Sequence, residues 1–246
     1  MFPLQDNIPS RNPPVATISI IAANCLIFTA ELSMPKETLF QVIKTLGIVP
    51  SQFTSGAWGA NIYVTANSIW PFITSMFLHG SWMHIITNMW MLWIFGDNVE
   101  DRMGSFRFFI FYLLCGVFAA IAHIISNIDS AIPTIGASGA IAGVLGAYFL
   151  LFPRAQVIVF FPLFIFWPIY YILPAFVYLG IWFLMQFLNG SLSLLSDSEA
   201  IEYVAWWAHI GGFVSGIILH RFFIQSYRIR RKPYIDELST RSAWAR

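Results

Sequence analysis

The chain has 246 residues, of which 58% are hydrophobic and only 10% are charged, and its mean hydropathy is +0.70. About a quarter of the residues of a soluble globular protein are charged, so this composition excludes that class. The net charge of +1 is close to neutral and adds little. We therefore expect an all-α polytopic membrane protein.

Six stretches of the chain contain no Asp, Glu, Lys or Arg, and a membrane span needs about 17–25 apolar residues. They are residues 15–30, 70–95, 108–126, 131–152, 155–196 and 203–220. The fifth stretch is too long for one helix, and prolines interrupt its first half. Residues 156–167 are therefore expected at the membrane interface, with the helix after them. The sequence predicts a compact bundle of six transmembrane helices.

The basic residues are unevenly divided between the two sides of such a bundle. Of the 13 Lys and Arg residues, only Lys36 and Lys44 fall on the side opposite the N-tail, the second and fourth loops and the C-tail. Both termini are therefore predicted to be cytoplasmic. The chain divides into an N-tail (1–14), a six-span domain (15–224) and a basic C-tail (225–246). We interpret the basic cluster at 228–232 as an anchor near anionic lipid, not as a nucleic-acid site.

The fourth stretch contains Ser138 in the sequence Gly-Ala-Ser-Gly. A serine in a membrane helix commonly bonds only to the carbonyl four residues earlier. Here another apolar stretch, about 70 residues later, carries His209 beside small residues. Counted from the first residues of their stretches at 1.5 Å per residue, Ser138 and His209 lie at a similar depth of about 10 Å. A nucleophile and a base on two neighbouring helices would allow hydrolytic chemistry within the bilayer.

Small residues line one face of each of these two expected helices. They are Gly136, Gly139, Gly143 and Gly146 in the fourth stretch, and Ala208, Gly212 and Gly216 in the sixth. Small faces let helix backbones approach closely in lipid. Plain helix packing is a sufficient explanation for Gly143, Gly146 and Gly216. The glycine faces would also bring the helices of Ser138 and His209 together.

The second stretch carries a third polar group, His79, His84 and Asn88. His84 and Asn88 are four residues apart and share a helix face. A zinc site is the alternative, but no His-Glu-x-x-His motif and no nearby carboxylate supports it. We expect no metal and no cofactor, and interpret His84 and Asn88 as hydrogen-bond donors to a developing oxyanion. Cys25 and Cys115 are interpreted as buried small hydrophobic residues.

In these residues the chain resembles the rhomboid intramembrane serine proteases, from about residue 14 to residue 223. Four motif elements occur in order, each in its expected span or loop. They are His79-x4-His84-x3-Asn88, Gly96-x3-Glu100-x3-Gly104, Gly136-x-Ser138-Gly139 and Ala208-His209-x2-Gly212-x3-Gly216. Each element alone is a weak signal, whereas the four together in a six-span chain are a strong one.

The resemblance implies that Ser138 is a nucleophile, that His209 is its general base, and that His84, Asn88 and the Ser138 N–H form the oxyanion hole. Glu100 and Gly104 would be structural. The first loop would lie in the outer leaflet, the fifth span would gate substrate access, and the fifth loop (189–200) would cap the site. Substrates would be single-pass or polytopic membrane proteins, cleaved within the lipid bilayer near its non-cytoplasmic face. No nucleic acid or metal is implied, and a bacterial inner membrane is the expected location.

Two positions depart from the family pattern. An aromatic residue that packs on the histidine is common four positions after the serine, but Ala142 stands there. The sequence does not identify what orients His209 instead. Trp58 is followed by Gly59 where an arginine is frequent.

Two alternatives to a protease stay open at this point. One is an inactive rhomboid-like protein that binds membrane clients, although such members typically lack the serine or the histidine. The other is a small transporter, although the chain shows neither internal repeats nor charged residues in the middle of its apolar stretches.

Overall fold

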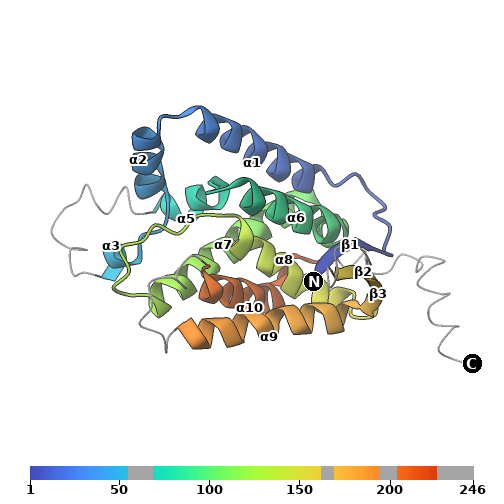
Figure 1. Ribbon diagram of the computed structural model, residues 1–246. Coiled ribbons are helices and arrows are strands. Elements are labelled where there is room, and N and C mark those ends of the chain that lie inside the picture. The colour runs from blue at the N-terminus through green and yellow to red at the C-terminus, as the bar shows by residue number, and fades with distance from the viewer. Residues whose placement is uncertain (55–68, 162–168, 194–203, 226–246) are drawn as a thin grey trace, which may run out of the picture.

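Helices account for most of the residues that the computed structural model describes, which are 1–54, 69–161, 169–193 and 204–225 (Figure 1). Six helices have 14 to 22 residues. They are α1 (Val15–Ser33), α6 (Trp82–Met103), α7 (Ser105–Ser126), α8 (Ser138–Leu151), α9 (Ala175–Ser193) and α10 (Trp206–Phe223). The shorter elements are α2 (Lys36–Leu46), α3 (Pro50–Thr54), α5 (Pro71–Thr74), the 3-10 helix η2 (Ser75–Phe77), and the strands β1 (Phe2–Asp6), β2 (Gln156–Phe161) and β3 (Ile169–Pro174).

Several of these helices are suited to a lipid environment. By length and composition, α1, α7 and α9 could each cross a membrane, and α8 is a shorter apolar helix. The chain is therefore a membrane protein. The count of six spans and the cytoplasmic location of both termini stay predictions.

Helix α8 lies at the centre of the bundle, in contact with α6, α7, α9 and α10 (Figure 1). All ten residues from Gly139 to Tyr148 are buried. At its C-terminal end Tyr148 packs edge-on against Phe95 of α6, with ring centroids 4.9 Å apart, and Phe95 stacks on Tyr178 of α9. Aromatic packing thus anchors the central helix at the end farther from Ser138.

At one end of the bundle, Glu100 of α6 fixes the start of α1. Its two carboxylate oxygens accept hydrogen bonds from the backbone N–H groups of Ala16 and Thr17, at 2.9 and 2.8 Å. The side chain of Ser105 also donates to it, at 2.6 Å. The first N–H groups of a helix have no partner within the helix, so Glu100 acts as a cap supplied by another element. Gly104 connects α6 to α7 with a φ of 81°, which favours glycine.

The same end carries a three-stranded antiparallel sheet in the order β1-β2-β3 (Figure 1). Phe2 pairs with Phe160, and Val157 pairs with Leu173. The expectation of an all-α chain is wrong here, because residues 2–6 of the N-tail and 156–161 of the expected interfacial segment are strands. The run of β-branched and aromatic residues in β2 is typical of a strand. The backbone N–H of Gln225, just after α10, reaches the carbonyl of Arg102 at the end of α6, 3.1 Å away. The N-terminal strand and the end of α10 therefore lie at the same end of the bundle.

Two helices begin later than the charge-free stretches predict. The second stretch begins at residue 70, but it is broken into α5 and η2 before α6 starts at Trp82. Ser81 caps α6 by accepting a hydrogen bond from the His84 N–H, 3.2 Å away. The fourth stretch begins at residue 131, but α8 starts only at Ser138. Pro133 and Gly136, which has a φ of 125°, precede that start. The helical rise from residue 131 that the depth of Ser138 was based on is therefore wrong.

Some sequence predictions lie outside the described residues. They concern Trp58 and Gly59 of the first loop, most of the fifth loop, and the basic C-tail.

Candidate active site

Ser138 is the first residue of α8, and the chain leading to it is held by contacts with other segments. Thr134 and Ile48 exchange backbone hydrogen bonds of 2.9 and 2.7 Å, and the N–H of Gly136 bonds to the carbonyl of Ser75 at 2.8 Å. This extended path carries the chain from the end of α7 to the start of α8, which lies in the half of the bundle away from the three-stranded sheet, where α10 also begins (Figure 1).

His209, in the first turn of α10, contacts Ser138 directly. Its Nε2 atom lies 2.8 Å from the Ser138 hydroxyl oxygen. That is an ordinary distance for a hydrogen bond. The neutral imidazole can accept the serine proton at Nε2 only if its own proton is on Nδ1. Nδ1 lies 2.8 Å from the side-chain oxygen of Gln186 on α9. Sequence reasoning did not identify Gln186, although it is an amide in an apolar helix.

Glycines permit the close approach of α8 and α10 that this contact needs. A Cβ atom added to Gly212 would overlap the carbonyl oxygen of Gly139, and one added to Gly216 would overlap that of Gly143. A Cβ on Gly139 would lie 2.7 Å from the Cβ of Ala119 on α7. The small faces predicted from the sequence therefore meet in the structure, backbone against backbone.

His84 and Asn88 lie beside the turn that precedes Ser138. A Cβ atom added to Gly136 would be 2.5 Å from Nε2 of His84 and 3.7 Å from Nδ2 of Asn88. Both polar side chains thus face the backbone two residues before the serine. The left-handed φ and the proximity of His84 each require glycine at position 136.

His79 lies just before α6 and holds Asn88. The Nδ2 atom of Asn88 is 3.1 Å from Nε2 of His79, whose ring packs edge-on against that of His84 with centroids 5.0 Å apart. The backbone N–H of His79 in turn bonds to the buried carboxylate of Glu31 on α1, at 3.2 Å. A second N–H of the Asn88 amide is left for another acceptor.

Within the described segments, no group of three His, Cys, Asp or Glu residues is arranged to hold a metal ion. Cys25 is exposed and Cys115 is buried, and both are free thiols. The interpretation of Cys25 as a buried residue is therefore wrong, because its side chain lies on the outer face of α1.

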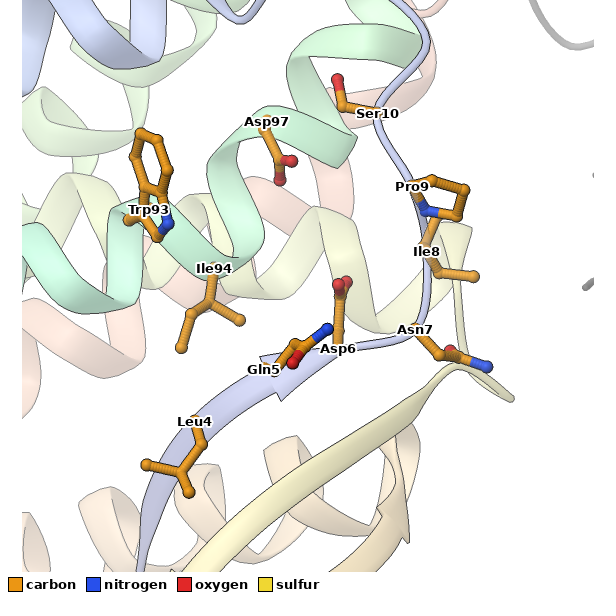
Figure 2. Close-up of a pocket in the computed structure, with 10 residues that line it drawn as sticks. All are labelled: Leu4, Gln5, Asp6, Asn7, Ile8, Pro9, Ser10, Trp93, Ile94 and Asp97. Carbon is orange, nitrogen blue, oxygen red and sulfur yellow. The ribbon is translucent and has the colours of Figure 1, made fainter.

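A separate pocket of about 330 Å³ lies beside β1, at the end of the bundle that carries the sheet (Figure 2). Residues 4–10 form one wall, and Trp93, Ile94 and Asp97 of α6 form the other. None of the predicted site residues lines it. The Asp6 carboxylate accepts hydrogen bonds from the Tyr148 hydroxyl and from Asn98, the latter at 3.0 Å. Burial nevertheless raises the pKa of Asp6 from 3.8 to about 6.

Known proteins resemble the chain across most of these elements. A model of the rhomboid domain matches residues 66–226, more than half of the chain. Rhomboid protein 1, mitochondrial, of Saccharomyces cerevisiae is 33% identical over 102 residues, which are 40% of this chain and 29% of that protein. Rhomboid protease GluP of Bacillus subtilis is 36% identical over 111 residues, which are 44% of this chain and 21% of that protein.

RHOMBOID-like protein 1 of Arabidopsis thaliana is 25% identical over 224 residues, which are 84% of this chain and 52% of that protein. The chain thus spans about half, or less, of the length of these relatives. The matched domain contains the contact between Ser138 and His209 as well as the segment from His79 to Asn88. The chain belongs to the rhomboid family.

Proposed function

We propose that the chain is an intramembrane serine endopeptidase in which Ser138 is the nucleophile and His209 the general base. The distance of 2.8 Å between the Ser138 oxygen and Nε2 of His209 is the observation that carries this proposal. Most membrane serines bond back to their own helix, as Ser19 of α1 does to the carbonyl of Val15 at 2.7 Å. Ser138 instead bonds to a base on another helix, which is the arrangement that activates a nucleophile.

The reaction would follow the usual course of acyl transfer. His209 takes the serine proton as the oxygen attacks the scissile carbonyl, and then delivers it to the leaving amine. His84, Asn88 and the Ser138 N–H would stabilise the oxyanion of the tetrahedral intermediate. The position of His84 and Asn88 against Gly136 supports this role. Water would then hydrolyse the acyl-enzyme, with His209 again acting as the base.

The substrates would be single-pass or polytopic membrane proteins. Ser138 and His209 lie at the starts of α8 and α10, in the half of the bundle away from the three-stranded sheet. With six spans and both termini cytoplasmic, as the basic residues indicate, cleavage would occur near the non-cytoplasmic face. A bacterial plasma membrane fits the match to a Bacillus protein, whereas the yeast relative is mitochondrial. A peptide bond within an intact helix is shielded, so a locally unstable substrate helix is favoured.

Labelling with a serine-directed fluorophosphonate probe tests the nucleophile, and cleavage of a model membrane substrate in liposomes tests the activity. Ser138→Ala should abolish both, and His209→Ala should abolish cleavage. Ser19→Ala is the matched control, because its hydroxyl makes only a local helix bond. An inactive client-binding protein would show no labelling in the wild type. Cleavage by Ser138→Ala at the wild-type rate would refute the proposed function.

A further inference from the structure

The orientation of His209 requires a partner that the family pattern does not supply in this chain. Position 142, on α8, holds an alanine that is fully buried where α8 packs against α10. A Cβ atom added to Gly212 would lie 3.2 Å from the Ala142 Cβ, so this face of α8 lies tightly against α10. A large ring at position 142 would not fit there without separating the two helices. The partner of the imidazole must therefore come from another element.

Helix α9 provides two side chains that contact His209. Gln186 places its Oε1 atom 2.8 Å from Nδ1, and it is only 7% exposed. Trp182 lies one turn earlier on the same face, with its ring centroid 6.0 Å from that of the imidazole. Gln186 approaches the edge of the ring that carries Nδ1, whereas Ser138 meets Nε2 on another edge. Trp207 ties α10 to α9 through a bond of 3.2 Å from its indole N–H to the carbonyl of Gly190.

Resting on the proposed function, we infer that Gln186 is the positioning residue for His209, and that Ser138, His209 and Gln186 form a hydrogen-bonded chain across three helices. An amide oxygen at Nδ1 accepts the ring N–H, so it selects the tautomer in which Nε2 is free to take the serine proton. The same oxygen faces the imidazolium that forms during acylation. In a serine protease triad this position is held by a carboxylate. Here a neutral amide holds the histidine without burying another charge in the bilayer.

This role predicts how two substitutions of Gln186 differ. Gln186→Met keeps the length and most of the packing of the side chain but removes the acceptor, so kcat should fall about 10- to 100-fold while KM stays within about twofold. Gln186→Glu keeps an oxygen at Nδ1 and should restore kcat to within about tenfold of the wild type. Where the glutamate is ionised, it also stabilises the imidazolium. Protonated His209 then persists to higher pH, so the acidic limb of the pH–rate profile of Gln186→Glu moves to higher pH.

The experiment measures kcat and KM of the full chain in liposomes, with Met185→Leu as the control on the exposed face of α9. Nitrogen-15 NMR of the histidine rings, assigned with His209→Ala, reports the tautomer independently of turnover. In the wild type His209 should carry its proton on Nδ1, and in Gln186→Met this preference should be lost. Thermal unfolding identifies any variant that has lost its fold.

The inference is overturned if folded Gln186→Met has the wild-type kcat, or if Gln186→Met and Gln186→Glu are impaired equally. Ser138→Ala is measured in parallel. If it is inactive while Gln186→Met is normal, only the role of Gln186 fails. If Ser138→Ala still cleaves, the proposed function fails whatever the Gln186 variants do.

Discussion

Gly212→Ala tests whether the chemistry depends on the contact between the backbones of α8 and α10. The added methyl group would overlap the carbonyl oxygen of Gly139, the residue that follows the proposed nucleophile. An ordinary contact between carbon and oxygen needs well over 3 Å, so the two helices must separate by about 1 Å. His209 is one turn before Gly212 and moves with it. The distance from Ser138 to His209 would then rise from 2.8 Å to roughly 3.5–4 Å, beyond hydrogen-bonding range.

A displacement of this size costs about 10²-fold in rate when it separates reacting groups. The loss of stability from overpacking should be about 1–3 kcal/mol, which leaves the protein folded. Cleavage in liposomes and fluorophosphonate labelling should therefore both fall about 10²-fold, while the unfolding temperature falls modestly. Gly180→Ala on α9 is the matched control, because an added Cβ there has no atom within 4 Å. Cleavage by folded Gly212→Ala at the wild-type rate would show that the close approach is not required for catalysis.

Three further predictions follow from other contacts. Glu100→Gln keeps one acceptor for the N–H groups at the start of α1 but loses the charge. The free energy of unfolding, measured in detergent, should fall by about 1–3 kcal/mol, and kcat should change less. Asn88→Ala removes a proposed oxyanion donor, so kcat should fall about 10²- to 10³-fold if Asn88 is the sole side-chain donor, and less if His84 shares the role. A wild-type kcat in liposomes would contradict it. Because the pKa of Asp6 is about 6 in the folded chain and 3.8 in the reference state, the folded chain binds the proton more tightly. The stability that protonated Asp6 contributes should be complete below about pH 4 and be lost as the pH rises through 6. Asp6→Asn should remove this dependence of the unfolding temperature on pH.

The structure brings together the polar residues that the sequence singled out, but their surroundings differ from those expected. Ser138, His209, His84 and Asn88 could be identified because polar residues in an apolar span are costly and are usually retained for a partner or a cavity. The contact of the small faces on α8 and α10 also follows from the spacing of the glycines. Gln186 carried the same signal as an amide in an apolar helix, but its partner depends on how α9 is rotated against α10. A sequence pattern does not fix that rotation.

The sheet was missed for a different reason. Strand β1 pairs with β2, which lies about 150 residues later, and local propensity contains no information on so distant a partner. The N-tail was accordingly expected to be only a polar tail. In the structure Pro3 also accepts a hydrogen bond of 2.6 Å from the Trp90 indole on α6, so the tail is fixed against the bundle.

The late start of α8 strengthens the proposed chemistry even though it contradicts the predicted span. In a helix that began at residue 131, the N–H of Ser138 would bond to the carbonyl of Thr134 and could not reach a substrate. In the structure the carbonyl of Thr134 instead faces Ile48, and the first hydrogen bond of α8 runs from the N–H of Ile141 to Ala137 at 3.0 Å. The N–H groups of the first turn are therefore not used within the helix, and they carry its positive dipole end. Under the proposed function, a helix that begins at Ser138 would offer the oxyanion backbone N–H donors in addition to the side chains of His84 and Asn88. An uninterrupted membrane helix through residue 138 would have given it only the side chains.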